Sequence, residues 1–462
     1  MENFSDFSVW GTYVLLATLF IALLTGNTLK RKLPFLKNSL IPTPVLGGLV
    51  LLIISAIYNA ITDEVFFNTA VFGGKGMETL EIITYHTLAL GFIASTLKTN
   101  SAKMSKKRAN EVLNTGVTTV ATYLLQGIIG LGITCIIAFY IIKDFYPASG
   151  ILLPFGYGQG TGQALNYGSI YESDGFVGGR SFGLTIAALG FLSAALGGVF
   201  HLNIRKKRGR LRPASKAEHY NSEDIQAENE IPMQGSIDKL TVQIAFVALV
   251  YFVTYGLMFL LTNWISGISS IVYGFNFIIG VLVATLAKQV IKLLHKTKLM
   301  NREYTNNFLL TRVSNFVFDI MVVAGIGAIR LDILEQYWGI MLILGVLGAV
   351  STYVYTRFIA KTLFPDYHEE QFLATYGMLT GTASTGVILL REIDGDFKTP
   401  AADNMVFQTF PAIVLGFPMM FLAVFAQSHP WICLLIFVIF FAVLNVFLFR
   451  SKIFKRKSKK SK

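Results

Sequence analysis

The chain has 462 residues, of which 53% are hydrophobic and only 14% are charged, and its mean hydropathy is +0.57. Soluble proteins average about 25% charged residues. This composition therefore excludes an ordinary water-soluble enzyme and predicts an all-α polytopic membrane protein. Both cysteines, Cys135 and Cys433, lie in apolar runs. A disulfide framework and a Cys-rich metal site are therefore excluded as well.

Eleven stretches are apolar enough to cross a bilayer, which takes roughly 20 residues. They lie at about 9–29, 41–61, 82–97, 113–141, 181–203, 239–262, 270–290, 313–329, 337–356, 403–426 and 431–449. The third and eighth are short and carry polar groups, so we expect protein rather than lipid around them. Glu2 and Asp6 precede the first stretch where a signal peptide would be basic, so we interpret it as a retained helix.

The basic residues predict the orientation of the chain, because the cytoplasmic flanks of membrane helices carry an excess of Lys and Arg. There are 39 Lys and Arg against 27 Asp and Glu, a net charge of +12. We place the N-terminus outside and the C-terminus inside. The only basic residues that then fall on the outer side are Lys75, Lys143, Arg180 and Arg330. The basic clusters each adjoin the inner end of a span, so we interpret them as topology determinants and expect no nucleic-acid partner.

Two glycine-rich segments, at about 147–170 and 367–392, are not assigned as spans. Residues 157–164 read YGQGTGQA and residues 376–383 read YGMLTGTA. They share the pattern Y-G-x-x-T-G-x-A, with five identities in eight positions. An acidic turn with an aromatic residue follows each segment. A matched pair at equivalent places in two halves indicates an internal repeat.

Each glycine-rich segment lies between the fourth and fifth spans of its half, and the two would enter the membrane from opposite sides. The chain is thus predicted to contain a first inverted repeat of five spans (1–203), a cytoplasmic linker (204–237), a second inverted repeat of five spans (238–428), and an extra span with a basic tail (429–462). Inverted repeats with broken glycine-rich elements are typical of secondary transporters. We expect the two re-entrant loops to meet near the membrane midplane and form a binding site.

The two loops offer chemistry for both a cation and an anion. Freed carbonyls at a broken helix coordinate a cation, whereas unpaired N–H groups and the positive end of the helix dipole attract an anion. We therefore predict sodium-coupled uptake of a carboxylate. Arg391 could neutralise a substrate carboxylate or serve only as a positive-inside residue. The candidate substrate-binding residues are Gly158, Gln159, Gly160, Thr161, Gly162, Gln163, Asn166, Gly381, Thr382, Ser384, Thr385 and Arg391.

Ionisable residues within spans are costly and therefore point to function. Asp319, with Asn315 one turn before it, lies in the eighth span, and His86 lies in the third, the equivalent place in the other half. We interpret Asp319 as a cation ligand or proton acceptor. His86 is explained equally well by an interhelical hydrogen bond. The candidate Na⁺ ligands are Asp319, Asn315, Thr161, Thr380, Thr382 and His86.

The two glycine-rich loops, the five-plus-five inverted arrangement and the cytoplasmic linker resemble the bacterial sodium/glutamate symporter family over nearly the whole chain. The resemblance implies a homodimer in the bacterial inner (cell) membrane, with a scaffold part and a mobile part that carries the loops. It also implies elevator-like alternating access and L-glutamate or a similar acidic amino acid as substrate. Neither loop keeps the family's Gly-Gly pair. The related 2-hydroxycarboxylate transporters carry citrate or malate, so Na⁺- or H⁺-coupled di- or tricarboxylate transport is the alternative.

An enzyme and a channel are the competing classes. The chain has no H-E-x-x-H motif and no paired intramembrane carboxylates at helical spacing. Residues 156–158 read GYG, as in a potassium-channel filter, but such a filter needs four equivalent loops and the second copy lacks the run. We therefore expect no enzymatic activity and no cofactor. Gln126, Asn404 and Gln408 either line the cavity or pair helices.

Overall fold

The structure is a computed structural model, and it describes residues 6–37, 41–98, 105–207, 230–233, 237–264, 272–273, 276–394, 398–450 and 452–453. Most of the predicted linker, 204–237, lies outside the described residues, as does the basic tail beyond residue 453. Residues 204–207 are described, and they continue the preceding helix. The acidic turn after the second glycine-rich segment is described only at its first residue, Asp394.

The described residues form helices joined by short turns, with no sheet among them. The first half contains α1 (Phe7–Lys32), α2 (Pro34–Lys37), α3 (Thr43–Thr62), η1 (Phe66–Asn68), η2 (Ala70–Phe72), α4 (Gly76–Leu97), α5 (Lys106–Tyr140), η3 (Pro147–Ile151), α6 (Leu152–Gln159), α7 (Thr161–Ser173) and α8 (Gly179–Lys207). The second half contains α10 (Lys239–Trp264), α12 (Asn276–Lys296), α13 (Asn307–Gly327), η4 (Asp332–Tyr337), α14 (Trp338–Leu363), η5 (Pro365–Tyr367), α15 (His368–Thr380), α16 (Ala383–Arg391), α17 (Ala401–Phe407), α18 (Thr409–Phe425) and α19 (Pro430–Leu448).

Ten of these helices are long and apolar enough to cross a membrane, and α17 with α18 meets the same test as a pair bent by 49°. Together they coincide with the eleven predicted spans, which confirms an all-α polytopic membrane protein. The third and eighth spans were expected to be short, but α4 and α13 are full-length helices of 22 and 21 residues. Their expected burial is confirmed: 50% and 56% of their apolar windows are buried, against 28% for α1 and 22% for α10.

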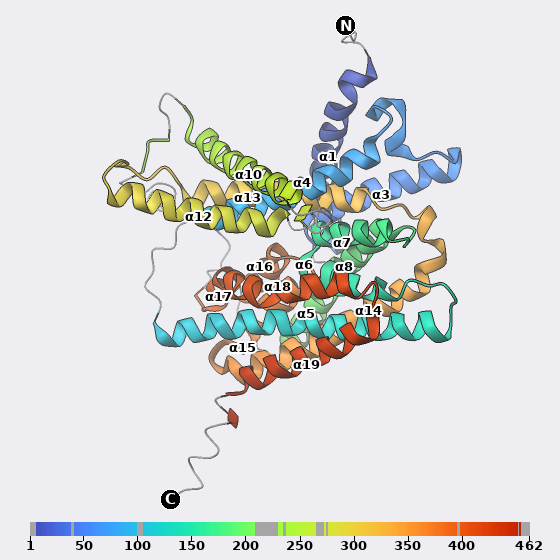
Figure 1. The fold of residues 1–462 in the computed structure, drawn as a ribbon. Coiled ribbons are helices and arrows are strands. Elements are labelled where there is room, and N and C mark those ends of the chain that lie inside the picture. The colour runs from blue at the N-terminus through green and yellow to red at the C-terminus, as the bar shows by residue number, and fades with distance from the viewer. Residues whose placement is uncertain are drawn as a thin grey trace, which may run out of the picture.

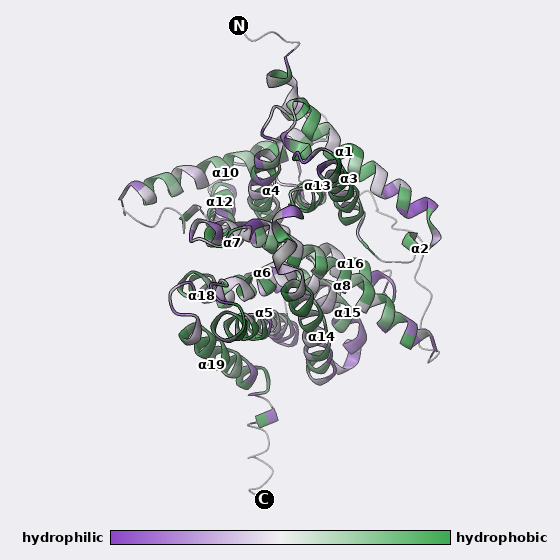
Figure 2. Ribbon diagram, turned by 90° about the vertical axis from the view of Figure 1, so that its right-hand side faces the viewer, coloured by the Kyte–Doolittle hydropathy of each residue, from purple (hydrophilic) through white to green (hydrophobic). Residues whose placement is uncertain are grey.

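The helices pack as two groups (Figure 1). The first bundle, as we define it, contains α1, α3, α4, α10, α12 and α13, and the second contains α5 to α8, α14 to α19 and the short helices between them. The described chain begins with α1 in the first bundle, and its last long helix, α19, lies in the second. Figure 2 shows hydrophobic residues along most of the long helices of both bundles. The two bundles meet mainly where α7 packs against α4 and α13.

Local sequence explains where two of the long helices begin. The side chains of Ser105 and Asn306 accept hydrogen bonds from the backbone N–H groups of Arg108 and Leu309, so they cap α5 and α13. Such caps satisfy N–H groups that the first turn leaves without a partner.

Small residues let α7 lie close to α8. A Cβ atom on Gly183 would lie only 2.4 Å from the Ala164 carbonyl oxygen.

Candidate functional site

The first glycine-rich segment folds as a hairpin of two short helices, α6 and α7, that turns at Gly160. This residue has a φ of +82°, a conformation that favours glycine. The rings of Phe155 and Tyr167 stack with their centroids 3.8 Å apart, so the two helices lie side by side. We call this the first hairpin.

The second glycine-rich segment forms a second hairpin from α15 and α16, which turns at Gly381 and Thr382. Gly377 and Gly386 bring its two helices together, because a Cβ atom on Gly377 would lie 2.8 Å from the Gly386 Cα atom. Both hairpins fall on the segments expected to be re-entrant loops.

Both segments are mostly helical, and only the turn residues leave the helical conformation. Several of the glycines serve packing instead. A Cβ atom on Gly158 would lie 2.2 Å from the Tyr123 ring, and one on Gly162 would lie 2.7 Å from the Leu88 side chain. The glycines therefore let neighbouring helices approach the hairpin, and they do not interrupt the short helices that contain them.

The tips of the two hairpins are in contact. A Cβ atom on Gly160 would lie 3.2 Å from the Thr382 methyl group and 3.7 Å from the Gly381 carbonyl oxygen. The tip of the first hairpin also touches the first bundle, where a Cβ atom on Gly325 of α13 would lie 2.8 Å from the Thr161 Cβ. The tips therefore meet beside the junction of the two bundles.

Gln126 of α5 joins the elements around the tips. Its Nε2 donates to the Thr352 hydroxyl at 2.8 Å and to the Leu379 carbonyl at 2.9 Å, so it links α14 to the end of α15. Its Oε1 has no hydrogen-bond partner although the residue is fully buried. The nearby Tyr123 hydroxyl donates to the Gly158 carbonyl at 3.0 Å.

Three further polar atoms at the first tip are buried without a hydrogen-bond partner: Thr161 Oγ1, Gln163 Nε2 and Gln159 Nε2. Thr161 is fully buried and Gln163 is 1% exposed. Leaving such a group unpaired costs about 1–3 kcal/mol, and native proteins rarely tolerate it without a reason. Four unpaired polar atoms around one tip, counting that of Gln126, mark a place where a polar ligand would bind.

The ends of four helices converge at the tips. The first helical bonds of α7 and α16 are donated by the N–H groups of Ala164 and Gly386, to the carbonyls of Gly160 and Thr382. The N–H groups just before these, at 161–163 and 383–385, have no partner within their helices. The C-terminal ends of α6 and α15 lie on the other side of each turn. The arrangement offers partial positive charge to an anion and partial negative charge to a cation.

The other candidate residues of the hairpins are placed as follows. Asn166 donates to the Gln163 Oε1 at 3.3 Å, and the hydroxyls of Thr382 and Thr385 lie 3.4 Å apart. Ser384 is in the first turn of α16, but its side chain lies outside the described residues. Arg391 is at the opposite end of α16, about 12 Å from the tip at 1.5 Å per residue. The structure therefore does not bring Arg391 to the tips.

Two of the predicted Na⁺ ligands, Asp319 and Asn315, lie one turn apart on an exposed face of α13. Asp319 is six residues from Gly325, which touches the first tip, so it lies about 9 Å away along the helix. His86 is exposed on α4, and its Nδ1 is 2.7 Å from the Tyr251 hydroxyl of α10. Its geometry fits the interhelical hydrogen bond. The structure does not gather these three side chains at the tips.

Asn404 and Gln408 lie at the bend between α17 and α18. Asn404 donates to the Tyr367 hydroxyl and to Gln371, both at 2.9 Å, which is a helix-pairing role. The sequence also contains one G-x-S-x-G match, at 179–183. Its serine, Ser181, lies in the first turns of α8 and not on the strand-to-helix turn of a hydrolase nucleophile.

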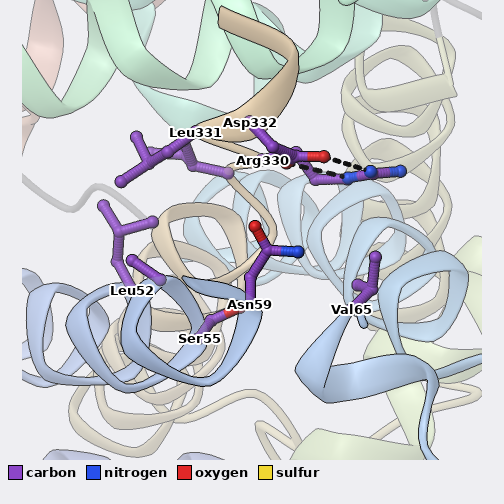
Figure 3. Close-up of a pocket in the computed structure, with 9 residues that line it drawn as sticks. Leu52, Ser55, Asn59, Val65, Arg330, Leu331 and Asp332 are labelled. Atoms are coloured by element: carbon purple, nitrogen blue, oxygen red, sulfur yellow. Dashed lines mark hydrogen bonds and ion pairs between the residues drawn. The ribbon is translucent and has the colours of Figure 1, made fainter. Parts of the chain in front are cut away.

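A small cavity of about 20 Å³ lies between α3 and the segment after α13 (Figure 3). Leu52, Ser55 and Asn59 line one side, and the ion pair of Arg330 with Asp332 lines the other. A single water needs roughly 10–15 Å³ of such space. The cavity is therefore too small for an amino acid and does not compete with the tips as a substrate site.

Among the described residues, no three His, Cys, Asp or Glu side chains gather as a transition-metal site would need. The polar groups at the tips are amides, hydroxyls and backbone groups, whose oxygen atoms suit a hard ion such as Na⁺.

No protein-family model matches the chain, and no curated protein is significantly similar to it.

Proposed function

We propose that the protein is a secondary transporter that imports an acidic amino acid, such as L-glutamate, together with Na⁺. One arrangement supports this above all: two hairpin tips in contact, surrounded by the unpaired buried polar atoms of Gln126, Thr161 and Gln163. The many-helix apolar fold fits a transporter in general. Broken helices that meet in the interior are the usual substrate sites of such proteins.

The chemistry of the tips divides between the two ligands. The substrate carboxylates would accept hydrogen bonds from the free N–H groups at the starts of α7 and α16, because helix N-termini attract anions. Na⁺ would be held by the carbonyls at the ends of α6 and α15 and by the Thr161 hydroxyl, an all-oxygen set. Neither ligand needs a charged side chain, and neutral dipoles bind without the cost of burying an unpaired charge.

The proposed transport cycle moves the second bundle, which carries both hairpins, past the first. Several parts of the proposal rest on the resemblance to sodium/glutamate symporters and on the distribution of basic residues. These are the elevator-like step, the inverted repeats, the outward N-terminus, the homodimer and the bacterial inner membrane. The separation of the helices into two groups supports the step, because α7 provides much of the contact between them.

Di- or tricarboxylate transport, coupled to Na⁺ or H⁺, is the second candidate, and one observation favours it. No acidic side chain occurs in residues 152–166 or 376–390. The ammonium group of an amino acid would have to rely on carbonyls and the Gln126 Oε1. A substrate that carries only carboxylates would need no such acceptors.

Uptake of radiolabelled L-glutamate into proteoliposomes tests the proposal. We expect saturable uptake with an inward Na⁺ gradient, and none in choline buffer at the same pH or in liposomes without protein. Equal uptake in choline would contradict sodium coupling, and collapse by a protonophore at a clamped Na⁺ gradient would indicate proton coupling. Competition by aspartate, malate and citrate distinguishes the two substrate classes. Uptake of no carboxylate at all would contradict the transporter.

A further inference from the structure

A larger cavity, of about 220 Å³, lies within the second bundle where α8 and α14 end and α15 begins. Where the cavity touches α15, it is about twelve residues, or roughly 18 Å along the helix, from the tip of the second hairpin. It is therefore separate from the proposed transport site. The polar side chains that line it are those of His201, Arg205, Tyr353, Arg357, Lys361 and Glu369.

Glu369 organises the wall of this cavity. Arg357 donates to both of its carboxylate oxygens, at 3.0 and 3.3 Å, and Arg205 lies 3.1 Å from one of them. His201 Nε2 is 2.7 Å from the same carboxylate. Burial alone would raise the pKa of Glu369, but the hydrogen bonds from His201 and Arg357 and the charges of Arg357 and Arg205 outweigh it and lower the pKa below its ordinary value.

The cavity carries more positive charge than this carboxylate can balance. Arg205, Arg357 and Lys361 face a single negative charge, that of Glu369. Lys361 forms no ion pair with any described residue. The two arginine side chains are only 16% and 22% exposed, whereas a residue that merely sets topology can extend into water. Guanidinium groups held in this way match the oxygens of a phosphate, to which they can donate two parallel hydrogen bonds.

The position of the cavity agrees with this chemistry. With the N-terminus outside, α8 and α14 both end at the cytoplasmic face, where the headgroups of anionic phospholipids and soluble phosphate esters are both present. Basic pockets between membrane helices on this side are known to hold acidic headgroups.

We propose that the cavity bounded by Arg205, Arg357 and Lys361 is a binding site for a phosphate group, supplied by an anionic phospholipid or by a soluble phosphate ester. The proposal does not depend on the transport function assigned to the hairpin tips. It requires only the surplus positive charge and the space inside this part of the second bundle.

Thermal unfolding of the purified full-length protein in a neutral detergent tests the proposal. The additives are short-chain phosphatidylglycerol, short-chain phosphatidylcholine as the zwitterionic control, glycerol 3-phosphate and inorganic phosphate. We expect at least one phosphate-bearing anion to raise the melting temperature in a saturable way, with no such effect of phosphatidylcholine. Stabilisation by phosphatidylglycerol alone identifies a lipid headgroup, and stabilisation by glycerol 3-phosphate or phosphate identifies a soluble ligand.

The Lys361→Gln variant assigns the effect to this cavity, because it removes the cation that has no ion pair and leaves Glu369 and its partners intact. We expect about fivefold weaker binding, since a basic residue near an anionic headgroup contributes about 1 kcal/mol. Arg205→Gln should weaken binding as well. Lys292→Gln, on the exposed face of α12, is the matched control and should bind as the wild type does. Absence of any anion effect, or equal binding in the wild type, Lys361→Gln and Arg205→Gln, would overturn the proposal.

Discussion

The two hairpins share the pattern Y-G-x-x-T-G-x-A, yet their helices break at different places in it. In the first hairpin the threonine of the pattern, Thr161, follows the break and begins α7. In the second, the aligned Thr380 precedes the break and ends α15. Thr161 Oγ1 is buried without a hydrogen-bond partner, whereas Thr380 Oγ1 donates to the Tyr376 carbonyl at 2.7 Å. A shift of the turn by two to three residues therefore decides whether the aligned threonine hydroxyl is unpaired, as at Thr161, or bonded within its own helix, as at Thr380.

The two tips also differ in what surrounds them. The first tip contacts the first bundle through Leu88 and Gly325. The second tip is supported within its own bundle, by the hydrogen bond from Gln126 to Leu379 and by the Phe191 ring of α8 beside Gly381. In the proposed site, the first hairpin would therefore supply a side-chain ligand in addition to backbone groups, while the second would supply freed backbone groups.

The largest expected effect comes from the turn of the first hairpin. Gly160→Val places a branched side chain at φ +82° and ψ −171°, a backbone conformation that is essentially restricted to glycine and costs an L-residue about 1–3 kcal/mol, and directly against Thr382. We expect substrate uptake to fall to background while the protein still inserts into the membrane. Gly175→Val is the matched control, because Gly175 has a φ of +100° but no neighbour that a Cβ atom would touch. Comparable uptake in the two variants would contradict our expectation that transport requires the two tips to be in contact.

The two aligned threonines give the sharpest test of the comparison. Thr161→Val removes the unpaired hydroxyl without changing the shape of the side chain, and we expect the apparent KM for Na⁺ or substrate to rise about tenfold or more, as for a lost bond to a charged group. Thr380→Val removes only a bond within α15, so its KM values should stay within about twofold of the wild type. Uptake kinetics at varied Na⁺ measure both. A larger effect at Thr380 than at Thr161 would reverse our assignment of roles.

A smaller effect is expected at the support of the second tip. Gln126→Leu leaves the Leu379 carbonyl buried without its donor, which costs about 1–3 kcal/mol, and should lower the melting temperature. Thr352→Val removes another bond of Gln126 but keeps the one to Leu379, so it should cost less. Thermal unfolding in detergent compares the two variants. If Thr352→Val were the more destabilising, the bond to Leu379 would not be what holds the second hairpin.

The sequence predicts the apolar architecture well, because each span carries its own hydrophobic signal. It also locates both hairpins through the shared pattern. It does not predict the residue at which each helix breaks, because that depends on packing partners such as Tyr123 and Leu88, which are distant in sequence. For the same reason the position of Asp319 on an exposed face of α13, away from the tips, could not be anticipated. Hydropathy identifies a polar residue in a span but not the direction in which it faces.

The smallest expected effect concerns an ion pair that joins the first hairpin to the first bundle. Arg180 of α8 lies 2.8 Å from Glu81 of α4, and its backbone N–H donates to Glu172 at the end of α7. If the bundles slide past each other, this pair exists in only one of the two states. It is partly exposed and therefore worth at most about 1 kcal/mol, so Glu81→Gln should change the maximal uptake rate by no more than about fivefold.

A double-mutant cycle separates this tether from general electrostatics. Arg180→Gln removes this pair and also the longer one with Glu172, at 3.9 Å, so the double variant should change the uptake rate no further than Arg180→Gln alone. Asp332→Asn, which breaks the ion pair with Arg330 two residues away in the chain, should leave the rate unchanged. Additive effects of the two substitutions would mean that Arg180 and Glu81 act independently. The first hairpin would then be coupled to the first bundle only through the packing of Thr161 and Gly162.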